Sequence, residues 1–252
     1  MIIGSRLFFC ENLPSTNSYA ASLLKNEDIP EGAIVYTDYQ SSGRGQAGNK
    51  WESEENKNLL ISLILFPSMI NPAEQFLLSM VISLGICDFL QRYTDAISIK
   101  WPNDIYVKDD KIAGILMENS IMGDIIEHTI AGVGININQV KFLSDAPNPV
   151  SLATITGMEY DLSECLGHLA SDLDKRYKDL ISGDYDCIKS DYVSQLYWQR
   201  QWRHFRDMTG IFTGCISGVG EAGRLQVELK NGKVNEYSFK EIEFIADDQL
   251  KP

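Results

Sequence analysis

Cysteine is scarce in this sequence, and its spacing provides no framework. The five cysteines lie at positions 10, 87, 165, 187 and 215, an odd number without a Cys-x-x-Cys pair. Disulfide scaffolds and structural zinc sites both need paired or clustered cysteines, so this spacing argues against either. We therefore expect reduced thiols in a cytoplasmic protein.

Basic residues are also few compared with acidic ones. The 252 residues include 22 Lys and Arg against 35 Asp and Glu, giving a formal net charge of −13. Nucleic-acid binding needs a basic surface, so this balance argues against nucleic acid as a partner. The N-terminus lacks the apolar region of a signal peptide, and the longest apolar run, Leu59 to Phe66, is too short to cross a membrane. The sequence predicts a soluble enzyme that does not enter the membrane.

The signatures of several common enzyme classes are missing. There is no Gly-x-Ser-x-Gly elbow and no His-Glu-x-x-His pair, and the three histidines, at 128, 168 and 204, stand in unrelated contexts. These gaps argue against serine-hydrolase and zinc-protease chemistry. A Walker A loop is absent too, because no Gly-Lys-Ser/Thr follows the glycine-rich segment described next.

A glycine-rich loop, Gly43-Arg44-Gly45-Gln46-Ala47-Gly48-Asn49-Lys50-Trp51, is the most informative segment present. Its three glycines disfavour regular structure and let the backbone N–H groups approach an anion closely. Arg44 can grip a carboxylate or phosphate, and Trp51 can stack on a flat ring. The loop suits a lid over a charged, planar ligand, although a simple hairpin turn explains it equally well on its own.

Three other segments place polar groups at the ends of predicted strands. Lys100-Trp101-Pro102-Asn103-Asp104 holds a lysine, an amide and a carboxylate close to a rigid Trp-Pro pair. Lys111 starts an apolar strand in which Gly114 leaves room for a ligand, and Gly132-Val133-Gly134-Ile135-Asn136 alternates glycine with bulkier residues. Taken singly, these segments are better explained by solvated strand ends and close packing.

Apolar periodicity and turn residues predict the order of the elements. Helices are expected after Ser15-Thr16-Asn17, from Pro72 to about Arg92, and twice between Leu162 and Arg203. Strands are expected at Leu7–Cys10, Ala33–Tyr39, Asn58–Phe66, Ile97–Trp101, Ile112–Glu118 and Asp124–Ile137. The tail holds four short predicted strands at Thr213–Ser217, Arg224–Leu229, Val234–Phe239 and Ile242–Ile245, with Asn231-Gly232 as a hairpin turn. This tail predicts a small β-barrel domain.

Together and in this order, these motifs resemble those of the biotin–protein ligases. The pentapeptide Lys100 to Asp104 followed by Lys111-x-x-Gly114-Ile115-Leu116 carries most of the resemblance. It implies an α+β fold of the class II synthetase-like type, with a mixed or antiparallel sheet flanked by helices. The catalytic domain would span residues 1–205 and an SH3-like domain residues 206–252. The chain starts directly at the catalytic domain, which predicts an enzyme without operator binding.

The resemblance implies two half-reactions. Biotin would first be activated by Mg·ATP as biotinyl-5′-AMP, and biotin would then be transferred to a lysine of a biotin carboxyl carrier protein domain. ATP and Mg²⁺ would serve as cosubstrate and metal, with no tightly bound prosthetic group. Family members can dimerise by extending their sheets edge to edge, so a homodimer is a further expectation.

Position by position, the resemblance assigns catalysis to Lys111 and Arg44. The positions implied for biotin are Ser15, Thr16, Gln40, Gly43, Arg44, Lys111, Gly114 and Ile115. The positions implied for ATP are Trp51, Lys100, Asn103, Lys111, Ile135 and Asn136. Asp104 would bind Mg²⁺ or orient the lysine.

The glycine-rich loop departs from the family pattern, which usually carries more arginines. Gln46, Ala47 and Asn49 stand in the loop, leaving Arg44 and Lys50 as its only cations. Two other functions stay open at this point. A lipoate or octanoate ligase would share the catalytic fold but need a long apolar tunnel, and a catalytically dead sensor of biotin or nucleotide would bind without releasing pyrophosphate.

Overall fold

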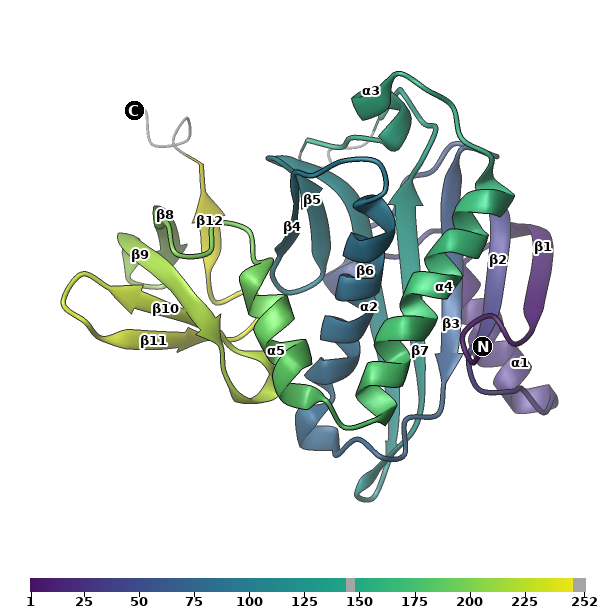
Figure 1. Cartoon of the computed structure of the whole chain (residues 1–252), viewed down its shortest axis with the longest axis horizontal. Coiled ribbons are helices and arrows are strands. Elements are labelled where there is room, and N and C mark those ends of the chain that lie inside the picture. The colour runs from purple at the N-terminus through teal and green to yellow at the C-terminus, as the bar shows by residue number, and fades with distance from the viewer. Residues whose placement is uncertain (144–147, 247–252) are drawn as a thin grey trace.

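The computed structural model describes residues 1–143 and 148–246, which form two sheets and their flanking helices (Figure 1). The larger sheet contains β1 (Leu7–Leu13), β2 (Ala33–Gln40), β3 (Asn58–Leu65), β4 (Ile97–Lys100), β5 (Asp104–Val107), β6 (Asp110–Met122) and β7 (Ile125–Asn136). Its order is β1-β2-β3-β7-β6-β5-β4, with β1 and β2 parallel and all other neighbours antiparallel. The predicted α+β class with a mixed sheet is confirmed.

Helices cover both faces of the larger sheet. They are α1 (Thr16–Asn26), α2 (Phe76–Leu90), α3 (Leu152–Thr156), α4 (Leu162–Ile181) and α5 (Tyr185–Ser194). Alternate residues of a strand face opposite sides. Accordingly, Val35 of β2 packs in the cluster beside α1, whereas Ile34 packs in the main core with α2 and α4. Central strands such as β3 are therefore buried on both faces, which explains their continuous apolar sequence.

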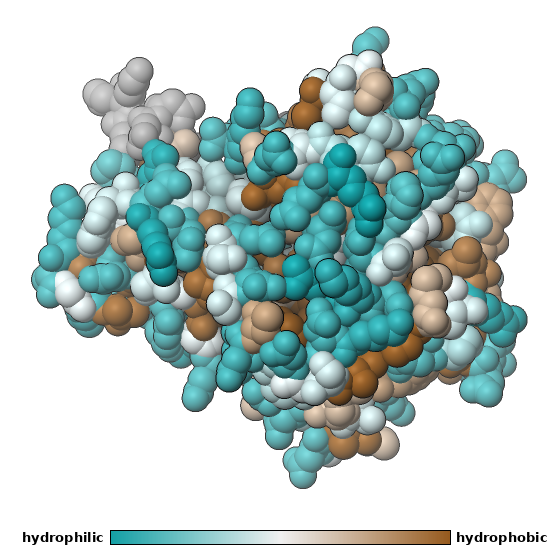
Figure 2. Space-filling model, viewed as in Figure 1, coloured by the Kyte–Doolittle hydropathy of each residue, from teal (hydrophilic) through white to brown (hydrophobic). Residues whose placement is uncertain are grey.

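Helix α2 is the core helix of the protein. With the short turn before it, the stretch Pro72–Leu90 is long and apolar enough to cross a membrane by length and composition alone, yet most of it is buried inside the protein. Gly85 permits close packing on α4, because a Cβ there would lie 2.7 Å from Leu173 Cδ2. The outer face on the α4 side is largely hydrophilic, with scattered apolar residues (Figure 2).

Several elements differ from the sequence-based expectations, among them the short helix α3, which was not predicted. The predicted helix at Pro72 begins as a 3-10 turn, η2 (Pro72–Glu74), before α2 starts at Phe76. Strand β5 was not predicted, because four residues between a proline and a turn are too few to display a period. Strand β8 was missed because it is rich in charge and buries only Phe205.

The smaller sheet contains β8 (Trp202–Asp207), β9 (Gly210–Val219), β10 (Leu225–Leu229), β11 (Val234–Tyr237) and β12 (Glu243–Ile245). Its order is β11-β10-β9-β8-β12, and every pairing is antiparallel, as expected of an SH3-like domain. The turn at Asn231-Gly232 is confirmed, with Gly232 at a φ of +81°. The predicted domain boundary at 205/206 falls inside β8, so the sheet begins four residues earlier, at Trp202.

The smaller sheet docks on the catalytic part through the turn η3 (Glu221–Gly223). Trp101 Nε1 donates a buried 2.8 Å hydrogen bond to the carbonyl of Gly223. A Cβ at Gly223, whose φ is +79°, would lie 2.3 Å from the Phe76 ring. This turn therefore needs glycine for both its conformation and its fit, and it fixes the smaller sheet beside the residues that follow β4.

Candidate active site

A cavity of about 630 Å³ opens between the glycine-rich loop, the larger sheet and the smaller sheet. It is lined by eleven of the predicted site residues: Ser15, Thr16, Gln40, Arg44, Trp51, Lys100, Asn103, Asp104, Lys111, Gly114 and Ile115. These residues come from five separate segments of the chain. Their convergence on one cavity is what the order of the motifs led us to expect.

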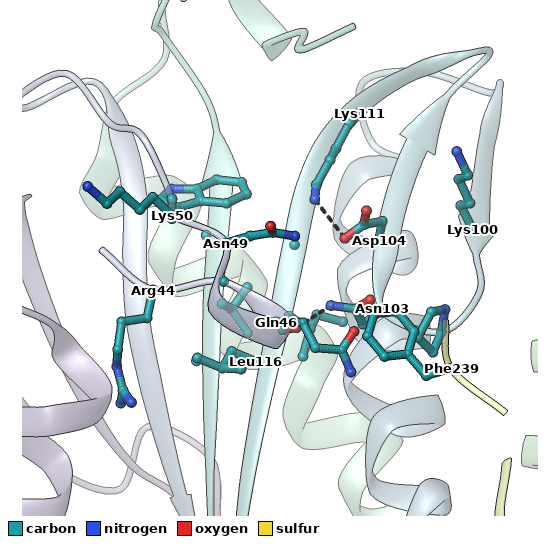
Figure 3. Close-up of a pocket in the computed structure, with 18 of the residues that line it drawn as sticks. Arg44, Gln46, Asn49, Lys50, Lys100, Asn103, Asp104, Lys111, Leu116 and Phe239 are labelled. Atoms are coloured by element: carbon teal, nitrogen blue, oxygen red, sulfur yellow. Dashed lines mark hydrogen bonds and ion pairs between the residues drawn. The ribbon is translucent and has the colours of Figure 1, made fainter. Parts of the chain in front are cut away.

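Lys111 and Asp104 form an ion pair in the wall of this cavity (Figure 3). Their Nζ and Oδ1 atoms are 2.8 Å apart, and the two side chains are 23% and 25% exposed. Asp104 stands opposite Gly114 in the register of β5 and β6, and a bulge between Ile105 and Tyr106 moves Lys111 within reach. A cation is thereby held at a defined place on a partly desolvated wall.

Two glycines on neighbouring strands open the sheet surface beside this pair. Gly114 of β6 lies opposite Gly134 of β7, and the Trp51 ring covers both. A Cβ would lie 3.0 Å from Trp51 Cζ3 at Gly114 and 2.4 Å from Trp51 Cε2 at Gly134. The Lys111 ammonium is 5.8 Å from the centre of the Trp51 ring. The absence of side chains at these two positions is therefore what admits a flat ring to the site.

The glycine-rich loop is folded back on itself as a hairpin. Trp51 N donates to the Gly43 carbonyl at 3.0 Å, Gly45 N donates to the Asn49 carbonyl at 2.7 Å, and Arg44 pairs with Lys50 in a short β-bridge. The hairpin interpretation is therefore correct, and the loop lines the cavity, whereas its role as a lid over a ligand stays a prediction. Its three-residue tip is the 3-10 turn η1 (Gln46–Gly48).

Arg44 lines the cavity, but its guanidinium points away from Lys111 (Figure 3). It makes a two-pronged ion pair with Glu118 of β6, at 3.0 and 2.8 Å. Glu118 also accepts a 2.7 Å hydrogen bond from Asn17, whose Oδ1 in turn accepts from Ser62 at 2.6 Å. Arg44 thus ties the loop to the sheet through a polar network whose inner members are buried.

The start of α1 is organised by Gln40 rather than by a serine cap. Ser15 occupies the N-cap position, but its side chain makes no capping hydrogen bond. Instead Gln40 Oε1 accepts from the Thr16 backbone N–H at 2.8 Å and from the Thr16 hydroxyl at 3.2 Å. This arrangement fixes the side chains of Thr16 and Gln40 beside Ser15 at one end of the cavity.

The pentapeptide Lys100–Asp104, which leads from β4 into β5, places its side chains on two different sides. Asn103 and Asp104 face the cavity side, where Asn103 Nδ2 donates to the Ile115 carbonyl at 2.7 Å and Ile115 N donates back to the Asn103 carbonyl at 3.0 Å. Lys100 and Trp101 face the smaller sheet, and burial lowers the pKa of the Lys100 ammonium. The peptide bond between Trp101 and Pro102 is cis.

Three predicted residues lie outside the cavity lining. Ile135 is fully buried in the core, because it alternates with the pocket-facing Gly134. Asn136 lies beyond that glycine, and its Nδ2 donates to the Val150 carbonyl at 3.0 Å. Gly43 is buried at the base of the loop, where a Cβ would be 2.5 Å from the Trp51 carbonyl oxygen. The positions of these residues lend no support to the predicted ligand contacts.

Several lining residues were not predicted. Asn17 and Leu116 line the catalytic side, and Arg206, Phe239, Ile242, Glu243, Phe244 and Ile245 line it from the smaller sheet. Glu118, the partner of Arg44, was also missed. Its signal was present in the sequence, because Gly114, Leu116 and Glu118 alternate along one face of a strand. Within residues 1–143 and 148–246, no three His, Cys, Asp or Glu side chains are grouped to hold a metal ion.

Comparisons with known proteins agree with this arrangement. The model of the biotin/lipoate A/B protein ligase family matches residues 9–136. The bifunctional ligase/repressor BirA of Bacillus subtilis is 31% identical over 94% of this chain and 74% of its own length. The biotin–[acetyl-CoA-carboxylase] ligase of Paracoccus denitrificans is 27% identical over 84% of this chain and 89% of its own.

Solved structures give the same result. The biotin protein ligase of Aquifex aeolicus in complex with biotin and ATP superimposes with a TM-score of 0.78 and 25% identity, over 95% of this chain and 98% of that one. The family model covers half of the sequence, and the Bacillus relative is matched along nearly the whole chain. The chain therefore belongs to the biotin/lipoate A/B protein ligase family.

Proposed function

We propose that this chain is a biotin–protein ligase, which activates biotin with ATP and transfers it to a lysine of a biotin carboxyl carrier protein domain. One observation carries the proposal: the Lys111–Asp104 pair lies beside a glycine-floored surface under Trp51, in a cavity lined by the glycine-rich loop. Such a site combines a fixed cation with room for flat rings. These are the features needed to join a carboxylate to a nucleotide.

In the first half-reaction, a carboxylate oxygen of biotin attacks the α-phosphorus of ATP. A bond forms between that oxygen and phosphorus, the bond from the α-phosphorus to the bridging oxygen breaks, and pyrophosphate leaves. Both reactants are anions, so a nearby cation lowers the energy of bringing them together. The Lys111 ammonium supplies this charge, and Asp104 holds it in place.

In the second half-reaction, the neutral ε-amine of the carrier lysine attacks the acyl carbon of the mixed anhydride. The new C–N bond forms, the bond from carbon to the phosphate oxygen breaks, AMP leaves, and the amine proton is lost to solvent. The mixed anhydride is sensitive to water, so a loop that covers the cavity protects it until the carrier arrives. Ser15, Thr16 and Gln40 offer hydrogen bonds for the ureido ring at the far end.

The residues around Asp104 are suited to a magnesium ion that is brought in by ATP. They are less suited to a magnesium ion that stays bound to the protein without nucleotide. Mg²⁺ is bound in nucleotide sites by one or two carboxylates together with phosphates. Asp104 is the carboxylate available beside Lys111, to which it is already paired. When bound with ATP, Mg²⁺ would offset phosphate charge, and Asp104 would contribute one oxygen or keep the lysine oriented.

The proposal is tested by biotin-dependent exchange of labelled pyrophosphate into ATP, followed by transfer to a purified carrier domain. We expect exchange with biotin and none without it. Faster exchange with lipoate or octanoate would assign the chain to the other branch of its family. Tight biotin binding without exchange would identify a sensor and overturn the proposal.

Replacing Arg44 with glycine is expected to preserve adenylate formation but to release several-fold more adenylate into solvent. The substitution removes the ion pair to Glu118 that ties the loop to β6, so the loop closes less firmly. The measurement is biotinyl-5′-AMP in the filtrate after single-turnover mixing. Arg92→Gly is a control, because Arg92 makes a similar two-pronged pair with Asp172 outside the cavity. Equal release by wild type and Arg44→Gly would contradict the role of the loop.

A further inference from the structure

The ammonium of Lys100 lies among three aromatic rings that come from three separate segments. Its Nζ is 4.8 Å from the ring centre of Tyr106 in β5, 5.4 Å from that of Phe244 in β12 and 5.9 Å from that of Tyr197. It also donates to the Tyr106 hydroxyl at 3.2 Å. We call Tyr106, Tyr197 and Phe244 the aromatic cage. A cation over ring faces is attracted by the negative charge of the π-systems.

Backbone pairing fixes the tyrosines of the cage. Tyr106 is part of β5, beside β4. The segment after α5 joins the free edge of β4, where Ile99 N donates to the Gln195 carbonyl at 2.8 Å and Tyr197 N donates to the Ile99 carbonyl at 2.9 Å. Tyr197 is further held by its hydroxyl, which donates to Asp109 at 2.7 Å. These two rings therefore belong to the rigid catalytic part.

Phe244 belongs to the smaller sheet. It pairs in register with Phe205 of β8, and the two rings meet edge to face at 5.3 Å. Phe205 is fully buried, so it anchors Phe244 to the core of that sheet. The ring of Phe244 thus brings the smaller sheet into contact with the charge of Lys100. Through this contact, the position of one sheet affects a lysine of the other.

Lys100 and Lys111 both line the cavity, and Lys100 lies on the far side of Asp104 from Lys111 (Figure 3). One carboxylate between two ammonium groups leaves an excess positive charge, which suits a polyanion. Burial is the main cause that lowers the pKa of Lys100, and the nearby Asp104 carboxylate opposes it. The cage stabilises the charged form of a lysine that has lost part of its hydration.

We propose that Phe244 is a positioning residue that holds the Lys100 ammonium at the cavity, so that this ring of the smaller sheet contributes through the lysine to binding the phosphates of the nucleotide. The inference rests on the proposed function, in which ATP occupies this cavity. It assigns the smaller sheet a specific task in nucleotide binding. Biotin, at the Gln40 end, is not expected to depend on it.

The test compares Phe244→Leu, which removes the ring, with Phe244→Tyr, which keeps it. Phe212→Leu is the matched control, because Phe212 packs on Phe205 and Tyr237 inside the same sheet and makes no contact with Lys100 among the ring contacts of the described residues. In the exchange assay we expect Phe244→Leu to raise the KM for ATP roughly three- to tenfold, as for the loss of one partly buried cation–ring contact. The KM for biotin should stay within about twofold.

Phe244→Tyr and Phe212→Leu should keep the wild-type KM for ATP. Equal KM values for ATP in Phe244→Leu and wild type, or an equal rise in Phe212→Leu, would overturn the proposal. Thermal unfolding shows whether each variant is folded, and Phe244→Met replaces Phe244→Leu if that variant does not fold. A wild-type protein without biotin-dependent exchange would instead refute the proposed function; the cage is then tested by titrating the same variants with ATP in a calorimeter.

Discussion

Lys111→Ala is expected to reduce biotin-dependent pyrophosphate exchange by about a hundredfold to a thousandfold, the range seen when one preorganised charge-stabilising group is removed. Its ammonium is held between Asp104 and the Trp51 ring. The carboxylate of biotin and the α-phosphate of ATP would meet at this place. The strand bulge between Ile105 and Tyr106 brings Lys111 opposite Tyr106 and so delivers its side chain to this place. The measurement is the exchange rate at saturating biotin and ATP.

The fold of Lys111→Ala should survive. The side chain is 23% exposed, and a partly solvated ion pair contributes on the order of 1 kcal/mol or less. The backbone of residue 111 keeps its hydrogen bonds to Asn148 and Val150, at 2.8 and 2.9 Å. Circular dichroism and thermal unfolding check this point, and an unfolded variant would refute the catalytic assignment.

Lys57→Ala is a matched control for this experiment. Lys57 makes an ion pair of similar length, 2.9 Å to Glu159, outside the cavity lining. The Lys57→Ala variant should keep an exchange rate within about twofold of wild type, although it loses an ion pair of similar length. Exchange by Lys111→Ala within tenfold of wild type would contradict the role of Lys111.

The sequence predicted those parts of the site in which residues close together in the chain are also close together in space. Lys111 and Gly114 lie three residues apart on β6, and the pentapeptide from Lys100 to Asp104 leads from β4 into β5, the strand that pairs with β6. The short turn between β5 and β6 places these groups together with little freedom. Alternation along the strand also accounts for the pocket-facing glycines 132 and 134.

The pairing of Lys111 with Asp104 could not be predicted, because it depends on register. A regular ladder would place Tyr106 opposite Ile112, whereas the bulge places it opposite Lys111. A shift of one residue reverses the face of every following side chain. No feature of the local sequence specifies this bulge, so the sequence left Asp104 open between a metal ligand and a partner for the lysine.

Contacts between the two sheets were beyond prediction for a different reason. The contribution of Phe244 depends on how the smaller sheet docks, and docking is set by Gly223 fitting against Phe76 and Trp101, more than 100 residues earlier in the chain. Turn residues and alternation describe β9 to β12 individually. They do not say which edge meets the catalytic part.

Gly134→Ala is expected to lower kcat/KM for ATP by about tenfold to a hundredfold, the loss that follows from displacing a ligand-positioning group by about 1 Å. The backbone of residue 134 is ordinary extended strand, so the substitution tests space alone. A Cβ there would lie 2.4 Å from Trp51 Cε2 and 2.7 Å from Cζ2, closer than any relaxed contact. The Trp51 ring must therefore move away from the sheet and into the space where a flat ligand would stack.

Two readouts separate this effect from general destabilisation. The KM for ATP should rise, and the tryptophan fluorescence of the free protein should change as the Trp51 ring moves. Gly167→Ala is the control, because no atom lies within 4 Å of a Cβ at that position of α4. There the extra methyl should leave activity unchanged and stabilise the helix by about 0.5–1 kcal/mol.

Gly114→Ala refines the comparison, because the same ring lies farther away there, at 3.0 Å. A shift of a few tenths of an ångström would accommodate that methyl group, so its loss in kcat/KM should be several-fold smaller than that of Gly134→Ala. The order of the two effects follows from the tilt of the Trp51 ring across the strand pair. If Gly114→Ala were the more damaging variant, the ring would lie differently when ATP is bound, and Trp51 would not be the surface on which the nucleotide stacks.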